Sequence, residues 1–208
     1  MTGPLPDDVA EPGAELAPAF EVLVPSADVS RRVDELAREL RDVYSGNDEP
    51  PVLVGVLKGS VLFLADLVRA LGIPVEVDFM SISSYAAGRQ SGVVRIEKDL
   101  DSDVHGRDVV IVEDIVDTGL TLNYLRRNLT ARGPRSLRAV TLLDKSVRRI
   151  VPVPLEHRGF DIPDVFVVGY GLDFQALYRN VRDILSVADL ARLANDPRLL
   201  VGPLWPSS

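Results

Sequence analysis

The sequence predicts an α/β fold in which a mostly parallel, twisted sheet is flanked by helices. Three observations point to it: short runs rich in Val, Ile and Leu, helical stretches that separate these runs, and Gly or Pro where helices end. A chain of 208 residues can bury the core of such a domain without disulfides or a structural metal. We therefore expect one main domain with a doubly wound architecture.

The predicted elements alternate along the chain. Residues 1–18 are rich in proline and lack an apolar period, so we expect a flexible leader there. Apolar residues then recur every three or four positions from Val29 to Val43, which predicts a packing helix that ends near Gly46. The further elements expected are strands at 52–57, 75–82, 109–116, 137–143 and 165–170, and helices at 60–71 and 121–131.

Two stretches depart from this alternation. Residues 83–101 hold several small residues and are predicted to form a long loop with a possible hairpin; such loops are often lids, although a merely solvated excursion remains an alternative. Residues 151–164 carry three prolines, and we expect an irregular cap over one end of the sheet. The expected organisation is a leader at 1–18, a main domain at 19–188 and a tail at 189–208.

Composition excludes several classes of site. The chain has no cysteine, so disulfides, iron–sulfur clusters, thiolate zinc sites and cysteine nucleophiles are excluded. The two histidines, His105 and His157, lack metal-binding spacing and are expected to be surface loop residues. A formal net charge of −8 argues against bulk binding to nucleic acid or to anionic lipid. The sequence shows neither a spanning apolar run nor a signal-peptide pattern, so we expect a cytoplasmic protein without a membrane partner.

One segment brings acids and hydroxyls to the end of a predicted strand. The apolar run Val109-Val110-Ile111-Val112 leads into Glu113 and Asp114, and then through Asp117-Thr118-Gly119-Leu120-Thr121 into a helix. Ligands of open α/β sheets bind at this end of the strands. Backbone N–H groups, threonine hydroxyls and the positive end of a helix suit a phosphate monoester. Each residue alone could be a helix cap or a solvated acid, but the combination is much rarer.

This run resembles the signature of type I phosphoribosyltransferases, which bind 5-phosphoribosyl-1-pyrophosphate (PRPP). The resemblance implies that Glu113 and Asp114 contact the ribose hydroxyls and that residues 117–121 wrap the 5′-phosphate. It also implies the family fold, with a small hood, mainly residues 150–185 plus the N-terminal part, and a long flexible active-site loop. Leu120 stands where relatives often carry a polar or basic residue, so we expect a neutral cradle made largely of backbone.

The resemblance covers about residues 20–185 and narrows to the hypoxanthine-guanine phosphoribosyltransferases. Leu57-Lys58-Gly59 is similar to their pyrophosphate loop, which implies a cis peptide bond between Leu57 and Lys58. Ser84 and Tyr85 lie where the closing loop of the family starts. The other implied contacts are Lys145 to the purine O6, Phe166 stacked on the purine, Val167 to the purine through its backbone, Asp173 to purine and metal, and Arg179 to pyrophosphate.

These residues also have other interpretations when they are taken one at a time. Lys58 could be a surface cation, Lys145 could pair with Asp144, and Phe166 could pack in the core. The functional interpretation is favoured because the residues follow three separate strands, and the ends of parallel strands meet at one edge of a sheet.

The implied reaction is purine salvage. Purine N9 displaces pyrophosphate from C1′ of PRPP, so that hypoxanthine gives IMP and guanine gives GMP. The resemblance implies that Asp117 takes the proton from N7 and that Mg²⁺ is held near Asp173, Glu113 and Asp114, mostly by substrate oxygens and water. A homo-oligomer, dimer or tetramer, is expected. The alternatives are a PRPP-sensing regulator, which would need a basic face for nucleic acid, and a transferase that prefers xanthine.

Overall fold

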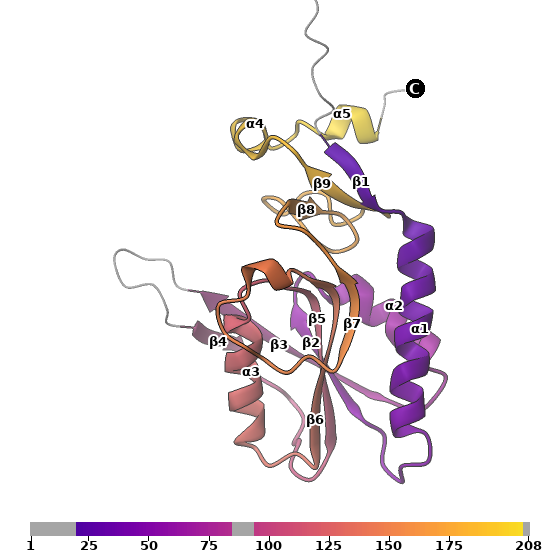
Figure 1. The fold of residues 1–208 in the computed structure, drawn as a ribbon. Coiled ribbons are helices and arrows are strands. Elements are labelled where there is room, and N and C mark those ends of the chain that lie inside the picture. Colours follow the sequence, from indigo (N-terminus) through magenta and orange to yellow (C-terminus); the bar gives the residue numbers. More distant parts are fainter. Residues whose placement is uncertain (1–19, 85–93, 206–208) are drawn as a thin grey trace, which may run out of the picture.

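The computed structural model describes residues 20–84 and 94–205, which form two sheets (Figure 1). The larger sheet has the strand order β4–β3–β2–β5–β6–β7. Its strands are β2 (Val52–Leu57), β3 (Glu76–Ser84), β4 (Val94–Lys98), β5 (Asp108–Val116), β6 (Ser136–Asp144) and β7 (His157–Asp161). All neighbours pair in parallel except β4, which is antiparallel to β3. The predicted fold class is confirmed.

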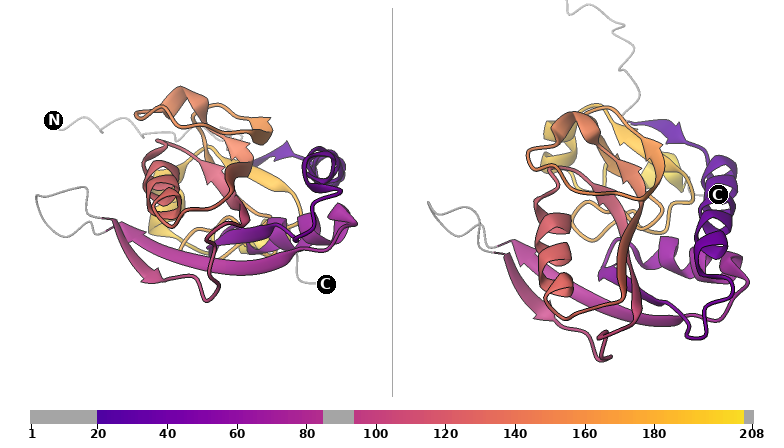
Figure 2. Two further views of the ribbon diagram at one scale, coloured as in Figure 1. Left: turned by 90° about the horizontal axis from the view of Figure 1, so that it is seen from below. Right: turned by 60° about the horizontal axis from the view of Figure 1, so that its bottom comes forward.

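Helices cover both faces of this sheet. The helices are α1 (Ser26–Tyr44), α2 (Val61–Leu71) and α3 (Leu120–Thr130). The bounds of α2 and α3 agree with the predicted ones within one residue, and α1 begins three residues before the predicted apolar period. Val110 and Val112 of β5 pack with α1 and α2, whereas Ile111 between them packs with α3. Both views of Figure 2 keep α1 and α3 on opposite sides of the strands. Successive side chains of a strand point to opposite faces of the sheet, so a strand that helices cover on both faces needs an unbroken apolar run.

A smaller antiparallel sheet lies at one end of the larger one (Figure 1). It has the order β1–β9–β8, with strands β1 (Phe20–Val24), β8 (Phe166–Val168) and β9 (Ile184–Val187). The run 165–170, predicted as a strand among those of the main sheet, therefore contributes to a separate sheet. Helices α4 (Leu190–Asn195) and α5 (Val201–Leu204) follow it, and the residues expected to be a tail bury Leu193 and Leu200 against this sheet.

The expectation of an irregular cap over residues 151–164 is wrong in part, because β7 lies there and completes the larger sheet beside β6. The expectation that His157 is a surface loop residue is also wrong. His157 begins β7, is 9% exposed, and has its Nδ1 2.9 Å from Oε2 of Glu39 on α1. An edge strand with the sequence HRGFD has no apolar run for a sequence pattern to detect.

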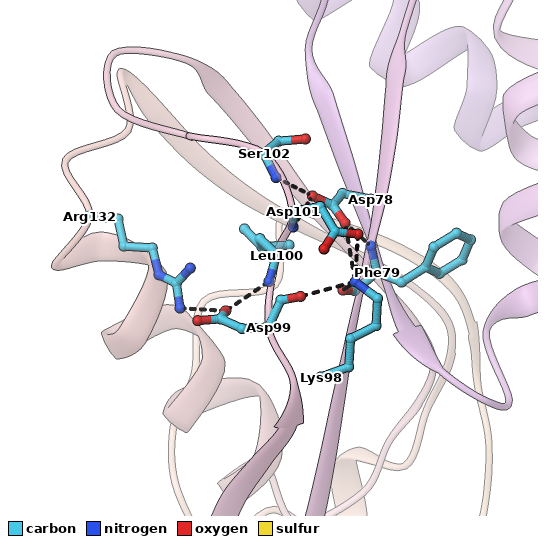
Figure 3. A network of polar contacts seen from close by, with 8 residues as sticks. All are labelled: Asp78, Phe79, Lys98, Asp99, Leu100, Asp101, Ser102 and Arg132. Carbon is cyan, nitrogen blue, oxygen red and sulfur yellow. Dashed lines mark hydrogen bonds and ion pairs between the residues drawn. The ribbon is translucent and has the colours of Figure 1, made fainter.

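The return from β4 to β5 is anchored by one buried carboxylate (Figure 3). Asp78 of β3 is 4% exposed and accepts hydrogen bonds from the backbone N–H groups of Phe79 at 2.7 Å and of Asp101 and Ser102 at 2.9 Å. Arg132 just after α3 pairs with Asp99 at 2.7 Å. The pairing of β3 with β4 confirms the predicted hairpin, whereas the leader and Tyr85 lie outside the described residues.

Within residues 20–84 and 94–205, no helix combines the length and the hydropathy that crossing a membrane requires.

Candidate active site

Three neighbouring parallel strands end at the same edge of the larger sheet. Lys58 follows β2, Asp114 lies near the end of β5, and Lys145 follows β6. The order β2–β5–β6 places these strand ends side by side. The predicted convergence is confirmed for these three, but it is wrong for Phe166, which begins β8 of the smaller, antiparallel sheet instead of following a strand of the larger one.

Glycines allow the backbone near Lys58 to pack closely. The peptide bond between Leu57 and Lys58 is cis, as the family resemblance implied. A Cβ on Gly59 would lie 1.6 Å from Oδ2 of Asp114, and a Cβ on Gly171 would lie 2.1 Å from the carbonyl oxygen of Gly59. The segments that follow β2 and β8 thus meet over Asp114, and neither glycine can carry a side chain without moving its neighbour.

The turn between β5 and α3 forms a small cavity of about 100 Å³ lined by Asp117, Thr118, Gly119 and Thr121, among others. Gly119 precedes α3 with a φ of 83°, a conformation that suits glycine. The carbonyl of Thr118 accepts hydrogen bonds from the N–H groups of Ile150 at 3.0 Å and Val151 at 3.2 Å, which fix the turn from outside. Leu120 is 48% exposed and brings no polar group, as expected.

Arg149 lies behind this turn, and sequence reasoning missed it. Its Nη1 lies 3.4 Å from the position that a Cβ on Gly119 would take, and this atom is buried without a hydrogen-bond partner among the described residues. Its Nη2 pairs with Asp144 at the end of β6. Arg149 does not line the cavity itself, but its guanidinium lies beside the turn and adds positive charge next to a cradle that was expected to be neutral. The signal was the Arg148-Arg149 pair soon after a strand end.

Burial raises the pKa of both Glu113 and Asp114. Burial, and then the charge of Asp114, raise the pKa of Glu113 well above its usual value, and its Oε1 is buried with no hydrogen-bond partner among the described residues. Burial raises the pKa of Asp114 to about 6, although the backbone N–H of Ile115 and the charge of Arg179 act in the opposite direction. A buried carboxylate oxygen without a hydrogen-bond partner can accept from a hydroxyl group of a ligand. Two carboxylates whose ionised form is destabilised by burial are also suited to a bound cation.

A metal ion would need help from the substrate to bind here. Among the described residues, no cluster of three or more His, Cys, Asp or Glu side chains could hold a metal by itself. Asp173, the third predicted metal residue, accepts from the N–H of Ala176 at 2.7 Å and pairs with Nη2 of Arg179 at 2.7 Å. The carboxylates therefore suit Mg²⁺ that arrives with phosphate oxygens and keeps some of its water.

The predicted purine residues line one cavity of about 310 Å³ between the two sheets. Its walls combine apolar groups with carboxylates and one cation; the residues are Asp114, Ile115, Asp117, Lys145, Phe166, Val167, Leu172 and Asp173. The ring of Phe166 packs edge-on against Phe174 with centroids 5.8 Å apart. The four apolar residues of this lining fit a flat heteroaromatic ring, and the four charged ones offer polar contacts to its edge.

The Lys145 side chain lines this cavity and does not pair with Asp144. Its Nζ donates to the carbonyl of Val165 at 2.8 Å, and its side chain is 8% exposed. Asp144 pairs with Arg149 and lies 3.6 Å from Nη1 of Arg158, so the alternative of a Lys145–Asp144 pair is wrong.

Asp117 lies where the two cavities meet, since it lines both the phosphate-sized cavity and the larger one. The remaining predicted residues are less completely described. Lys58 is exposed beside the site, Arg179 binds the carbonyl of Gly171, and Ser84 ends β3 with its side chain outside the described part.

Comparisons with known proteins agree with this geometry. The family model of the phosphoribosyl transferase domain matches residues 25–175. The chain is 50% identical over 162 residues to the hypoxanthine phosphoribosyltransferase of Salmonella typhimurium, covering 77% of this chain and 91% of the relative. It is 49% identical over 175 residues to the hypoxanthine-guanine phosphoribosyltransferase of Mycobacterium tuberculosis, covering 81% and 87%. A structure of the hypoxanthine phosphoribosyltransferase of Trypanosoma cruzi matches with a TM-score of 0.79 and 41% identity, covering 85% and 95%.

Proposed function

The chain belongs to the phosphoribosyltransferase family, among the hypoxanthine and hypoxanthine-guanine enzymes, and on this premise we propose that it acts in purine salvage. It transfers the 5-phosphoribosyl group of PRPP to N9 of hypoxanthine or guanine, and it releases IMP or GMP with pyrophosphate. The gathering of Lys145, Phe166 and Asp117 around one cavity is the observation that supports a purine as acceptor.

PRPP lies across the edge of the larger sheet in this proposal. Its 5′-phosphate occupies the turn 117–121, where N–H groups, the helix α3 and Arg149 supply positive potential. The ribose hydroxyls donate to Glu113 and Asp114, whose burial makes such donors favourable. The pyrophosphate lies by Lys58 and Gly59 and takes a charge-assisted contact from Arg179.

Asp173, Glu113 and Asp114 would hold Mg²⁺ together with PRPP, and the ion would supply positive charge to the departing pyrophosphate. The residues of the chain position the reacting groups. Phe166 stacks on the base, the backbone of Val167 contacts its edge, and Lys145 donates to O6. Adenine carries an amino group at this position, which cannot accept from an ammonium, so 6-oxopurines are preferred.

Asp117 serves as the general base in the proposal. It lies between the phosphate turn and the purine cavity, so its carboxylate can take the proton from N7 while N9 attacks C1′. General-base catalysis contributes about 10²–10⁴-fold. Positioning of the two substrates and stabilisation of the pyrophosphate must contribute the remaining acceleration.

The assembly, location and limits of the catalytic unit are also proposals. We place the catalytic unit at residues 19–188, with the hood mainly within 150–185, and we expect a cytoplasmic homo-oligomer. Ser84 and Tyr85 begin the closing loop by analogy with the family.

The function is tested by pyrophosphate release with PRPP, Mg²⁺ and each purine in turn. Hypoxanthine and guanine should support release, adenine should not, and a reaction without base gives the background. Release with xanthine alone would instead make the protein a xanthine transferase. Binding of PRPP without release for any base would favour a PRPP-sensing regulator.

A further inference from the structure

One oxygen of Asp117 has a single charged contact within the described residues. Its Oδ1 is buried and accepts no hydrogen bond there, but it lies 3.2 Å from Nε of Arg148. The Asp117 side chain is nevertheless 41% exposed, and it lines the purine cavity. The oxygen on Arg148 is thus turned away from solvent, which leaves Oδ2 to face the substrate.

Arg148 is itself anchored at a second point. Its Nη1 lies 3.3 Å from Oδ1 of Asp164, which precedes β8. A cavity of about 430 Å³ beside the purine cavity is lined by Asp117, Arg148 and Asp164, together with Lys145 and Phe166. The guanidinium therefore links the segment after β6 to both the turn before α3 and the hood, at the rim of the purine site.

We propose that Arg148 is a positioning residue that orients Asp117 for proton transfer. Through Nε it holds Oδ1 and keeps Oδ2 aimed at N7 of the purine, while Asp164 fixes the guanidinium. This inference rests on the proposed function, because it gives Asp117 the role of base. A base whose second heteroatom is held by a third group is a recurring arrangement in enzymes.

The arrangement has a chemical reason as well as a geometric one. A carboxylate without a second restraint can rotate, and a misplaced base loses much of its effect. During the reaction the N7–H bond breaks, its proton passes to Oδ2, and the electron pair stays on the purine as N9 attacks. Arg148 keeps its protons throughout.

The test compares variants at position 148 with and without Asp117. Arg148→Ala should lower kcat about 10-fold, a part of the whole general-base effect, and leave the KM for PRPP unchanged. Arg148→Lys should recover part of the loss through its charge, whereas Arg148→Met should not. The matched control is Arg31→Ala, which removes a similar exposed pair with Asp28 at 2.8 Å on α1 and should leave kcat unchanged. Unfolding midpoints of all variants should match that of the parent.

The double variant separates orientation of Asp117 from direct contact with substrate. Once Asp117→Asn has removed the base, adding Arg148→Ala should lower kcat no further. Equal loss in both backgrounds would overturn the inference, because Arg148 would then act on the substrate itself. Parental kcat in Arg148→Ala would overturn it as well, with the proposed function intact. If the parent protein transfers no phosphoribosyl group at all, the proposed function fails and this inference fails with it.

Discussion

Replacing Asp78 by asparagine should destabilise the protein by about 2–4 kcal/mol at neutral pH. Oδ2 of Asp78 receives the N–H groups of both Asp101 and Ser102, and Oδ1 receives that of Phe79 (Figure 3). An amide can point its oxygen at the pair only, so its NH₂ group then faces the N–H of Phe79. One charge-assisted hydrogen bond, worth about 1.5–3 kcal/mol, is lost, and two others become neutral.

The effect should depend on pH in a defined direction. Burial by itself raises the pKa of Asp78, but hydrogen bonds from Ser102, Phe79 and Asp101 outweigh it, and the net pKa lies below its usual value. A lowered folded pKa stabilises the protein above the unfolded pKa of about 3.9, and that stabilisation is lost as pH falls through the folded pKa. The difference in the free energy of unfolding between parent and Asp78→Asn should therefore be full above about pH 5 and shrink below about pH 4.

Urea unfolding of both proteins, at pH 7 and at a series of lower pH values, measures this difference. The matched control is Asp101→Asn, the same change in the same cluster, because the Asp101 side chain is 85% exposed and should matter by less than about 0.5 kcal/mol. Equal midpoints for parent and Asp78→Asn at pH 7 would refute the reasoning. So would a difference that stays constant down to pH 3.

Three further changes test the site. Asp117→Asn should lower kcat about 10²–10⁴-fold and spare PRPP binding, and near-parental turnover would refute its role as base. Burial raises the pKa of Asp114 to about 6, so ionisation of Asp114 destabilises the folded state increasingly as pH rises from its unfolded pKa of about 3.9, and fully above about pH 6. Asp114→Asn should therefore stabilise the protein by about 1–3 kcal/mol at pH 7, but not below pH 4, in thermal unfolding. Gly171→Ala, whose Cβ would lie 2.1 Å from the carbonyl oxygen of Gly59 at a φ of 97°, should raise the KM for PRPP more than the KM for hypoxanthine. An unchanged ratio of the two KM values would contradict the close packing of these segments.

The sequence predicts the central strands well because strands buried on both faces consist almost entirely of apolar residues. A strand covered on both faces, such as β2 with its sequence VLVGVL, must be apolar throughout. The acids at the end of β5 stand out for the same reason, since they interrupt such a run. Because each of Lys58, Asp114 and Lys145 lies at or just after the end of a predicted parallel strand, the sequence alone places them at one edge of the sheet.

The sequence predicts poorly those strands and contacts that depend on residues distant along the chain. Strand β7 is an edge strand with polar residues, and its partner β6 rather than its own pattern makes it a strand. The small sheet joins β1 to β9, which are separated by most of the chain, so no local period could reveal it. Arg149 reaches Gly119 from thirty positions later because Ile150 and Val151 bind the carbonyl of Thr118. Local patterns cannot record such a contact.

The charges of the site explain how an acidic chain can hold PRPP. The chain carries a formal net charge of −8, yet three guanidiniums lie at the edge where we propose that the substrate binds, and each already faces a carboxylate. Arg179 pairs with Asp173, Arg149 with Asp144, and Arg148 with Asp117. Such pairs avoid the cost of isolated charges before substrate arrives. In the proposed function, PRPP and Mg²⁺ bind by exchanging ionic partners with Arg179 and Asp173, whereas Arg148 keeps its contact with Asp117. The affinity should therefore depend on the difference between old and new contacts rather than on the net charge of the protein.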